Sequence, residues 1–250
     1  MPRLPALDPP PAAAQLPEEF RARAEHVIAD HLPRISQRAE RLVLRVLHAA
    51  AQMEHRLQDA EVLDAARALR LAPDDALAGV KLAATDSQRL NDSAGAAFWN
   101  ERNPQLALEL QLRAFGANPL DAEAAGNLSF YYLKQRPAQP EVARRLALYA
   151  LALQHPQFPA GRIEDWTTLA IASALAGRER DARNAFFVTL ALSPTLDRQC
   201  RAVTAAYASH GEQLRAPAEA MLARIRSWGR SQESPFCRWP PNWWAGARPL

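Results

Sequence analysis

Apolar residues along most of the chain are spaced three or four positions apart, or at multiples of that spacing, as on the buried face of an amphipathic helix. The longest such stretch covers residues 34–57 and predicts one long helix. A shorter helix is expected over residues 18–30, with Pro33 ending it. Two more are expected, from residue 59 or 61 to 71 and from residue 74 to about 84. These stretches predict an N-terminal helical region over residues 18–87.

From about Gln88 the pattern becomes regular, with helices of about a dozen residues alternating with short breaks. The breaks contain prolines or single glycines, residues that end helices. Such regular spacing calls for a search for internal repeats. The breaks fall at Asn103-Pro104, Asn118-Pro119, residues 136–140, residues 155–161, Gly177, Ser193-Pro194 and Gly211.

Residues 163–196 align with the segment that follows them at a spacing of 34 positions. This alignment places Gly177 on Gly211, and the same shift applied upstream places Phe98 on Tyr132. A period of 34 residues with two helices per unit is the signature of the tetratricopeptide repeat.

The chain therefore resembles the tetratricopeptide repeat (TPR) family, whose motif runs W-x2-L-G-x2-Y, then A-x3-F, then P. The unit over residues 88–121 lacks the aromatic residue after Ala107 and has Gln111 there, and the unit over residues 122–162 is about seven residues too long. An ordinary alanine-rich helical bundle with chance periodicity is the alternative. The unit over residues 163–196 follows the motif at Trp166, Leu169, Ala170, Ser173, Ala182, Phe186 and Pro194.

The resemblance implies an all-α fold, a TPR-like solenoid of antiparallel helix pairs with an N-terminal helical extension. One pair cannot bury its apolar face alone, so neighbouring pairs stack into a continuous core. The expected organisation is a flexible Pro-rich tail over residues 1–17, the helical region over 18–87, repeats over 88–228 divided into 88–121, 122–162, 163–196 and 197–228, and a Trp/Pro-rich tail over 229–250.

Composition and charge narrow the possible partners. The chain has 30 Lys and Arg against 27 Asp and Glu, and these charges are interleaved rather than gathered in a basic stripe, so no nucleic acid is expected. No uncharged apolar run is long enough to predict a membrane span. The two cysteines carry no motif, and no secretion signal is visible at the N-terminus. We expect a cytoplasmic protein, and its bias toward Ala and Arg suggests a bacterial one.

The resemblance also implies a binding surface, because the first helices of TPR units line a concave groove that takes a peptide or helix. The apolar residues in this groove could instead bury against a neighbouring helix or the chain's own tail. The Lys, Asn and Arg clamp with which some family members hold a C-terminal carboxylate is not expected, since only Asn127 matches it. By family position, the groove residues are Arg89, Asp92, Trp99, Asn100, Asn127, Phe130, Leu133, Lys134, Ile171, Leu175 and Arg201.

The Trp-rich tail offers a second candidate interaction site. Trp239, Trp243 and Trp244 lie among prolines, so this segment cannot form a regular helix. The tail could cap the last repeat, anchor the chain on a partner protein or, less expected, contact a membrane interface. A structural homo-oligomer built through this tail is a further alternative.

No motif points to catalysis, and no catalytic residue, metal ligand or cofactor is assigned. His48 and His55 lie two helical turns apart, but the chain contains no HExxH, P-loop, GxGxxG or GxSxG motif. The sequence therefore predicts a protein–protein interaction module, an adaptor, scaffold or chaperone-like subunit of a larger bacterial assembly. A metal-dependent or other enzyme on a helical scaffold, using the N-terminal histidines, is the alternative.

Overall fold

The computed structural model describes residues 18–52, 60–69, 71, 77, 82–153, 155 and 157–192. The tails over 1–17 and 229–250, the expected unit over 197–228 and the end of the third unit lie outside the described residues. In the described part the chain is helical and forms no strand, which confirms the all-α class. Its elements are α1 (Glu18–His26), the π-helical turn η2 (Val27–His31), α2 (Leu32–Gln52), α3 (Ala60–Arg67), α4 (Ala84–Trp99), α5 (Pro104–Ala117), α6 (Ala122–Lys134), α7 (Pro140–Leu153), α8 (Ile163–Leu175) and α9 (Glu179–Leu192).

The predicted helix breaks from Asn103 to Gly177 are found where the sequence places them, and those at Ser193-Pro194 and Gly211 lie outside the described residues. Asn103 caps α5 by accepting a hydrogen bond from the Leu106 amide at 3.0 Å, and Pro104 begins the helix. Asp121 caps α6 in the same way. Gly177 separates α8 from α9 with a φ of 72°, a left-handed conformation that favours glycine.

The expectation that Pro33 ends the first helix is wrong. The backbone stays helical from Glu18 to Gln52, and Pro33 is the second residue of α2. The turn just before it is the π-helical η2, where the Leu32 amide donates to the Val27 carbonyl five residues earlier. Proline has no amide hydrogen to donate and its ring crowds the preceding turn, and the widened turn meets both constraints.

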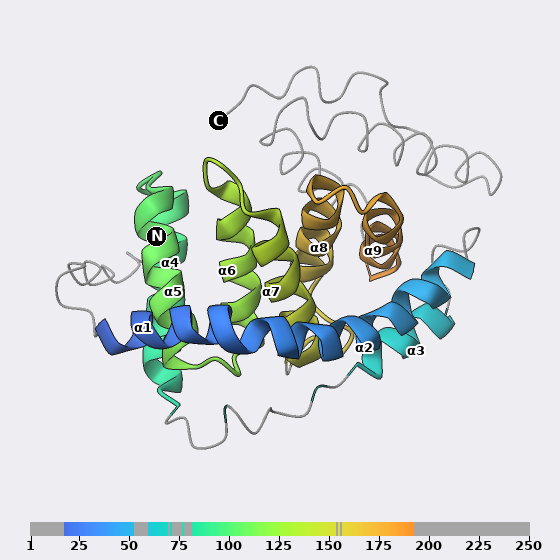
Figure 1. The fold of residues 1–250 in the computed structure, drawn as a ribbon, viewed down its shortest axis with the longest axis horizontal. Coiled ribbons are helices and arrows are strands. Elements are labelled where there is room, and N and C mark those ends of the chain that lie inside the picture. Colours follow the sequence, from blue (N-terminus) through green and yellow to red (C-terminus); the bar gives the residue numbers. More distant parts are fainter. Residues whose placement is uncertain are drawn as a thin grey trace, which may run out of the picture.

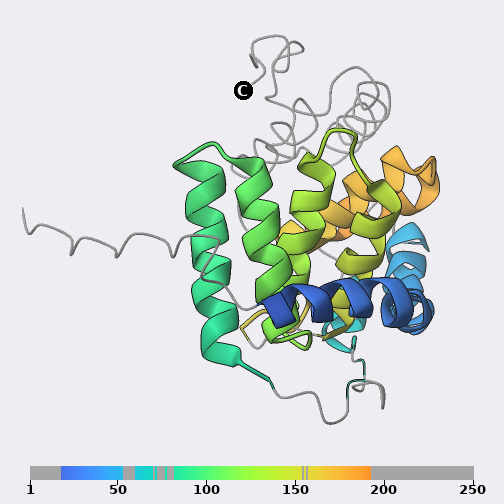
Figure 2. The same ribbon diagram turned by 60° about the vertical axis from the view of Figure 1, so that its left-hand side comes forward.

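Three antiparallel helix pairs, α4–α5, α6–α7 and α8–α9, follow one another along the chain (Figure 1). Consecutive pairs contact each other because α5 packs on α6, α7 packs on α8, and the first helices α6 and α8 also touch. We call residues 18–52 the strap, because this continuous helical segment crosses the second helices: α1 packs on α5, and α2 packs on α7 and α9. Figure 2 shows the strap running across the pairs near one end of the helices.

The core consists of three apolar clusters that follow the same order. Phe20 of the strap joins α4 and α5, and Leu32 and Ile35 join α5, α6 and α7 around Phe115 and Tyr149. The third cluster brings Val43 and Val46 of α2 together with α3, α7, α8 and α9, with Trp166 fully buried among them. The strap therefore contributes to every cluster.

Buried arginines fix the strap to the second helices. Arg113 of α5 lies 2.8 Å from Glu109 and 3.1 Å from Glu18 of the strap. Arg144 of α7 lies 2.9 Å from Glu40, further along the strap. Both guanidinium groups are largely shielded from solvent. Removing a carboxylate that pairs with them would therefore cost more stability than removing one from an exposed ion pair.

Gly116 sets how closely α1 can approach α5. A Cβ atom at this position would collide with the main-chain carbonyl of Phe20, and Arg23 donates to the Gly116 carbonyl at 3.1 Å. Because the obstacle is backbone rather than a flexible side chain, the contact leaves no room for a larger residue.

We predict that Gly116→Ala destabilises the protein by about 1–3 kcal/mol, because the strap must move away from α5. Chemical unfolding followed by circular dichroism measures this change. The matched control is Gly95→Ala in α4, where an added Cβ meets nothing within 4 Å. That variant should be stabilised by up to about 1 kcal/mol through helix propensity alone. Equal stabilisation of both variants would contradict the close contact.

Candidate functional site

The expected groove residues of the first unit lie on α4 or just after it, and all four are exposed. Arg89 pairs with Asp86 at 3.3 Å, and Asp92 accepts a hydrogen bond from Gln88 at 3.0 Å. Trp99 is the last residue of α4 and is 67% exposed, and Asn100 follows it. These residues share the side of the molecule formed by the first helices.

The α6 and α8 residues divide into surface and core. Asn127, Phe130 and Lys134 of α6 are partly exposed. Leu133 and Ile171, which were expected to line the groove, are buried in the third apolar cluster, at 2% and 3% exposure. Their expected placement is wrong because α6 and α8 turn these positions toward α7 and α9 rather than toward the open side.

The other residues singled out in the sequence are partly buried, lie outside the described residues or are exposed elsewhere. Leu175 is partly buried and packs against the same cluster. Arg201 and the tail residues Trp239, Trp243 and Trp244 lie outside the described residues, as does His55. His48 is exposed on α2.

Four rings from α4 and α6 form what we call the aromatic cluster: Phe98, Trp99, Phe130 and Tyr131. Phe98 contacts Trp99, Phe130 and Tyr131 at centroid distances of 4.8, 5.4 and 5.4 Å. Trp99 and Phe130 face each other at 6.3 Å with an interplanar angle of 25°. The cluster therefore has a buried base at Tyr131 and an open edge at Trp99.

Lys134 lies over the open side of the aromatic cluster. Its ammonium nitrogen is 5.1 Å from the centroid of the Phe130 ring, within the range of a cation–π interaction. Burial lowers the pKa of Lys134 to about 8, because the charged form loses hydration against the rings. Burial raises the pKa of Tyr131 to about 12, so its phenol is neutral at physiological pH.

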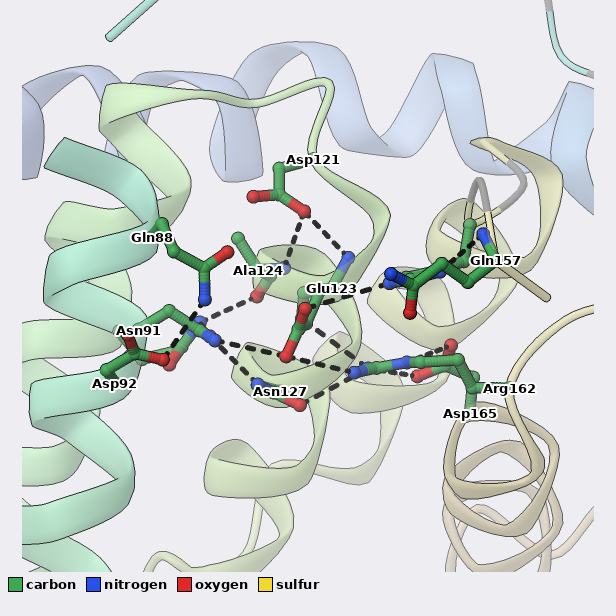
Figure 3. A network of polar contacts seen from close by, with 12 residues as sticks. Gln88, Asn91, Asp92, Asp121, Glu123, Ala124, Asn127, Gln157, Arg162 and Asp165 are labelled. Carbon is green, nitrogen blue, oxygen red and sulfur yellow. Dashed lines mark hydrogen bonds and ion pairs between the residues drawn. The ribbon is translucent and has the colours of Figure 1, made fainter. Parts of the chain in front are cut away.

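A second feature, the polar ladder, links the three first helices (Figure 3). The Asn91 side-chain oxygen on α4 accepts hydrogen bonds from Gln111 at 2.9 Å and from Asn127 of α6 at 2.8 Å. Asn127 in turn accepts a hydrogen bond from Arg162, at the start of α8, at 3.2 Å. Polar side chains thus run without interruption from the first pair to the third.

The ladder ends in a buried ion pair. Arg162 makes two hydrogen bonds to Asp165, at 2.7 and 3.0 Å, and it also lies 3.8 Å from Glu123. His155 approaches the other oxygen of Glu123 at 3.7 Å. Burial raises the pKa of Asp165, and the adjacent Arg162 guanidinium opposes that rise.

Sequence reasoning did not identify Asn91, Glu123, Arg162 or Asp165 as parts of one network. One signal was present: Gln111 occupies the position where the repeat expects an aromatic residue, and in the structure it connects α4 to α6 by also donating to the Ala124 carbonyl at 3.0 Å. The other members are ordinary polar residues in helical segments. Only the packing of the pairs brings them together.

A comparison with protein-family models, curated proteins and solved structures finds no match to this chain. The TPR resemblance therefore remains a prediction.

Two further observations concern membrane spans and metal sites. In the part of the chain that the structure describes, no helix has the length and apolar character needed to cross a membrane. In that same part, no group of three or more His, Cys, Asp or Glu side chains is arranged to hold a metal ion. What the described surface offers is an exposed aromatic edge beside a cation, on helices that the polar ladder also joins.

Removing the acid of the buried ion pair should be costly. We predict that Asp165→Ala lowers the free energy of unfolding by about 3–5 kcal/mol, because Arg162 is left charged and buried. The control is Asp64→Ala, whose pair with Arg67 is exposed and should change stability by less than about 1 kcal/mol. Urea unfolding measures both, and an equal effect would show that the ladder does not depend on this pair.

The pKa of Lys134 can be measured directly because the chain contains only two lysines, Lys81 and Lys134. Methylation with ¹³C labels both lysines and the N-terminal amine, which itself titrates near pH 8. We expect the NMR signal that is absent from Lys134→Arg to titrate with a midpoint near pH 8. A midpoint above about pH 10 for that signal, near the ordinary lysine value, would contradict the burial of this ammonium group.

Proposed function

We propose that this chain is a protein–protein interaction module built on TPR-like helix pairs, and that the side formed by α4, α6 and α8 binds an extended peptide or helix of another protein. The observation that carries the proposal is Trp99. This side chain is 67% exposed even though it packs against a cluster of three other aromatic rings.

The aromatic cluster has the properties of an anchor site. Large aromatic side chains dominate the binding energy of many interfaces because they bury much area at a small entropic cost. Here Phe98 and Phe130 already hold the Trp99 ring from two directions. A partner would therefore meet a surface that needs little further ordering, which lowers the cost of binding.

Charge indicates the kind of segment that would fit. Lys134 lies over Phe130, and the exposed Arg102 and Arg136 follow α4 and α6 at the same end of the helices, with Glu101 as the nearby acid. A partner segment with an apolar side chain for the rings and carboxylates beside it would complement this surface. Such a segment would also favour the charged form of Lys134.

The position of the strap supports the assignment of binding to the side formed by the first helices. It packs on α5, α7 and α9, so the second helices are already covered within the chain. The first helices have no corresponding cover among the described residues. A module of this kind would serve as an adaptor or scaffold subunit in a larger assembly.

The test uses a displayed library of random peptides. We expect the wild-type protein to enrich sequences that combine apolar and acidic residues, and we expect Trp99→Ala to reduce binding of a selected peptide by at least about 30-fold, equivalent to about 2 kcal/mol, as for an interface anchor. Lys134→Glu should weaken the acidic peptides and leave uncharged ones less affected.

The matched control is Leu44→Ala, which removes another exposed apolar side chain, on the strap rather than on the first helices. It should bind the selected peptides like the wild type. Circular dichroism should be unchanged in all three variants. If no peptide is enriched, or if Trp99→Ala binds as well as the wild type, the proposed function is wrong.

A further inference from the structure

The π-helical turn in the strap brings together two histidines that a regular helix would keep apart. In an α-helix, residues five positions apart point about 140° away from each other. In η2 the turn is widened, and the Nε2 atoms of His26 and His31 lie 3.2 Å apart. Widened turns of this type are rare and occur frequently at functional sites.

The hydrogen bonds of this pair specify which nitrogen carries a lone pair. The Nδ1 atom of His26 lies 2.7 Å from a carboxylate oxygen of Asp30. A carboxylate only accepts hydrogen bonds, so Nδ1 carries the hydrogen and the Nε2 atom of neutral His26 is an acceptor. His31 then donates from its own Nε2 to that lone pair.

A metal ion can take the place of the shared hydrogen. Two nitrogens bound to one tetrahedral Zn²⁺ at about 2.0–2.1 Å are about 3.3–3.4 Å apart, close to the separation of the two Nε2 atoms. His31 would change to the tautomer that carries its hydrogen on Nδ1, which frees its Nε2 lone pair for the ion, so both ligands would be neutral. A carboxylate hydrogen-bonded to the far nitrogen of a ligating histidine, as Asp30 is here, is the usual support of such a ligand.

We propose that His26 and His31 form a two-histidine site for a divalent transition metal such as Zn²⁺, with Asp30 as the positioning residue and water completing the coordination. His26 is 62% exposed, so an ion can reach the pair from solvent. The site is independent of the peptide-binding surface, because it belongs to the strap.

Because of where the two histidines lie, a bound ion would stabilise the folded strap. Val27 and Leu32, at the two ends of the same turn, are buried in the core cluster shared with α5, α6 and α7. An ion bound to both histidines would stabilise the widened turn. Because it binds the folded strap better than an unfolded chain, it would raise the melting temperature.

The experiment titrates Zn²⁺ into the full chain by calorimetry, with Cys200 and Cys237 replaced by serine so that no thiolate competes. We expect one binding event that is weakened at least tenfold in His26→Ala and in His31→Ala. Asp30→Asn should weaken it about tenfold, as loss of such a supporting carboxylate typically does. His48→Ala is the matched control on the same strap and should bind like the parent.

A second measurement keeps the test independent of stability. Long-range ¹H–¹⁵N NMR spectra of the histidine rings should show the Nε2 signals of His26 and His31 moving with Zn²⁺, while circular dichroism shows all variants to be equally helical. Zn²⁺ binding that is unaffected by His26→Ala, or the absence of saturable binding, would overturn the proposal. Neither result would affect the peptide-binding proposal.

Discussion

The packing of the strap against the second helices is the contact on which the rest of the structure depends. A helix pair in an array has two apolar sides, and its neighbours in the array cover only part of them. Here the outer surface of α5 and α7 contains Phe115 and Tyr149, and these rings are buried in the cluster that includes Leu32 and Ile35 of the strap. Without the strap this surface would face water.

Two kinds of contact fix the position of the strap along α5 and α7. Gly116 lets the backbone of α1 come close to α5, and the buried arginines of α5 and α7 pair with Glu18 and Glu40. These anchor points are far apart along the strap, and η2 lies between them. A continuous helix has a fixed rise per residue, so a local change of pitch is one way to satisfy both anchors. The π-helical turn lies between the two anchors, where such an adjustment can be made.

The strap covers the second helices, so the first helices form the side that differs from them. The first helices meet through polar side chains as well as apolar ones, and the polar ladder from Asn91 to Asp165 connects all three pairs. Hydrogen bonds are directional, so they restrict how the helices rotate more than apolar contacts do. Trp99 and Phe130 lie on α4 and α6, two of the helices that these hydrogen bonds join.

Sequence periodicity predicted the helices and most of their ends, because proline, glycine and capping residues act locally. The resemblance to the TPR family placed Phe130 and Lys134 at the surface, but it placed Leu133 and Ile171 there as well. Periodicity shows which residues share a helical face; it does not show how much of that face the neighbouring helices cover. The π-helical turn was also missed, because Pro33 alone predicts the end of a helix and not a widened turn within a continuous one.

The contact between α6 and α8 shows why the polar ladder could not be deduced. A Cβ at Gly126 would collide with the side chains of Asp165 and Arg162, so the glycine is what makes room for a buried ion pair. Replacing such a pair with apolar residues often leaves stability unchanged or improves it, so stability alone does not explain its presence. The two-point contact of Arg162 with Asp165, together with its bond to Asn127, instead fixes the rotation of α8 relative to α6. In the sequence the glycine resembles one more small residue in an alanine-rich helix; its role depends on a charged pair nearly forty positions away.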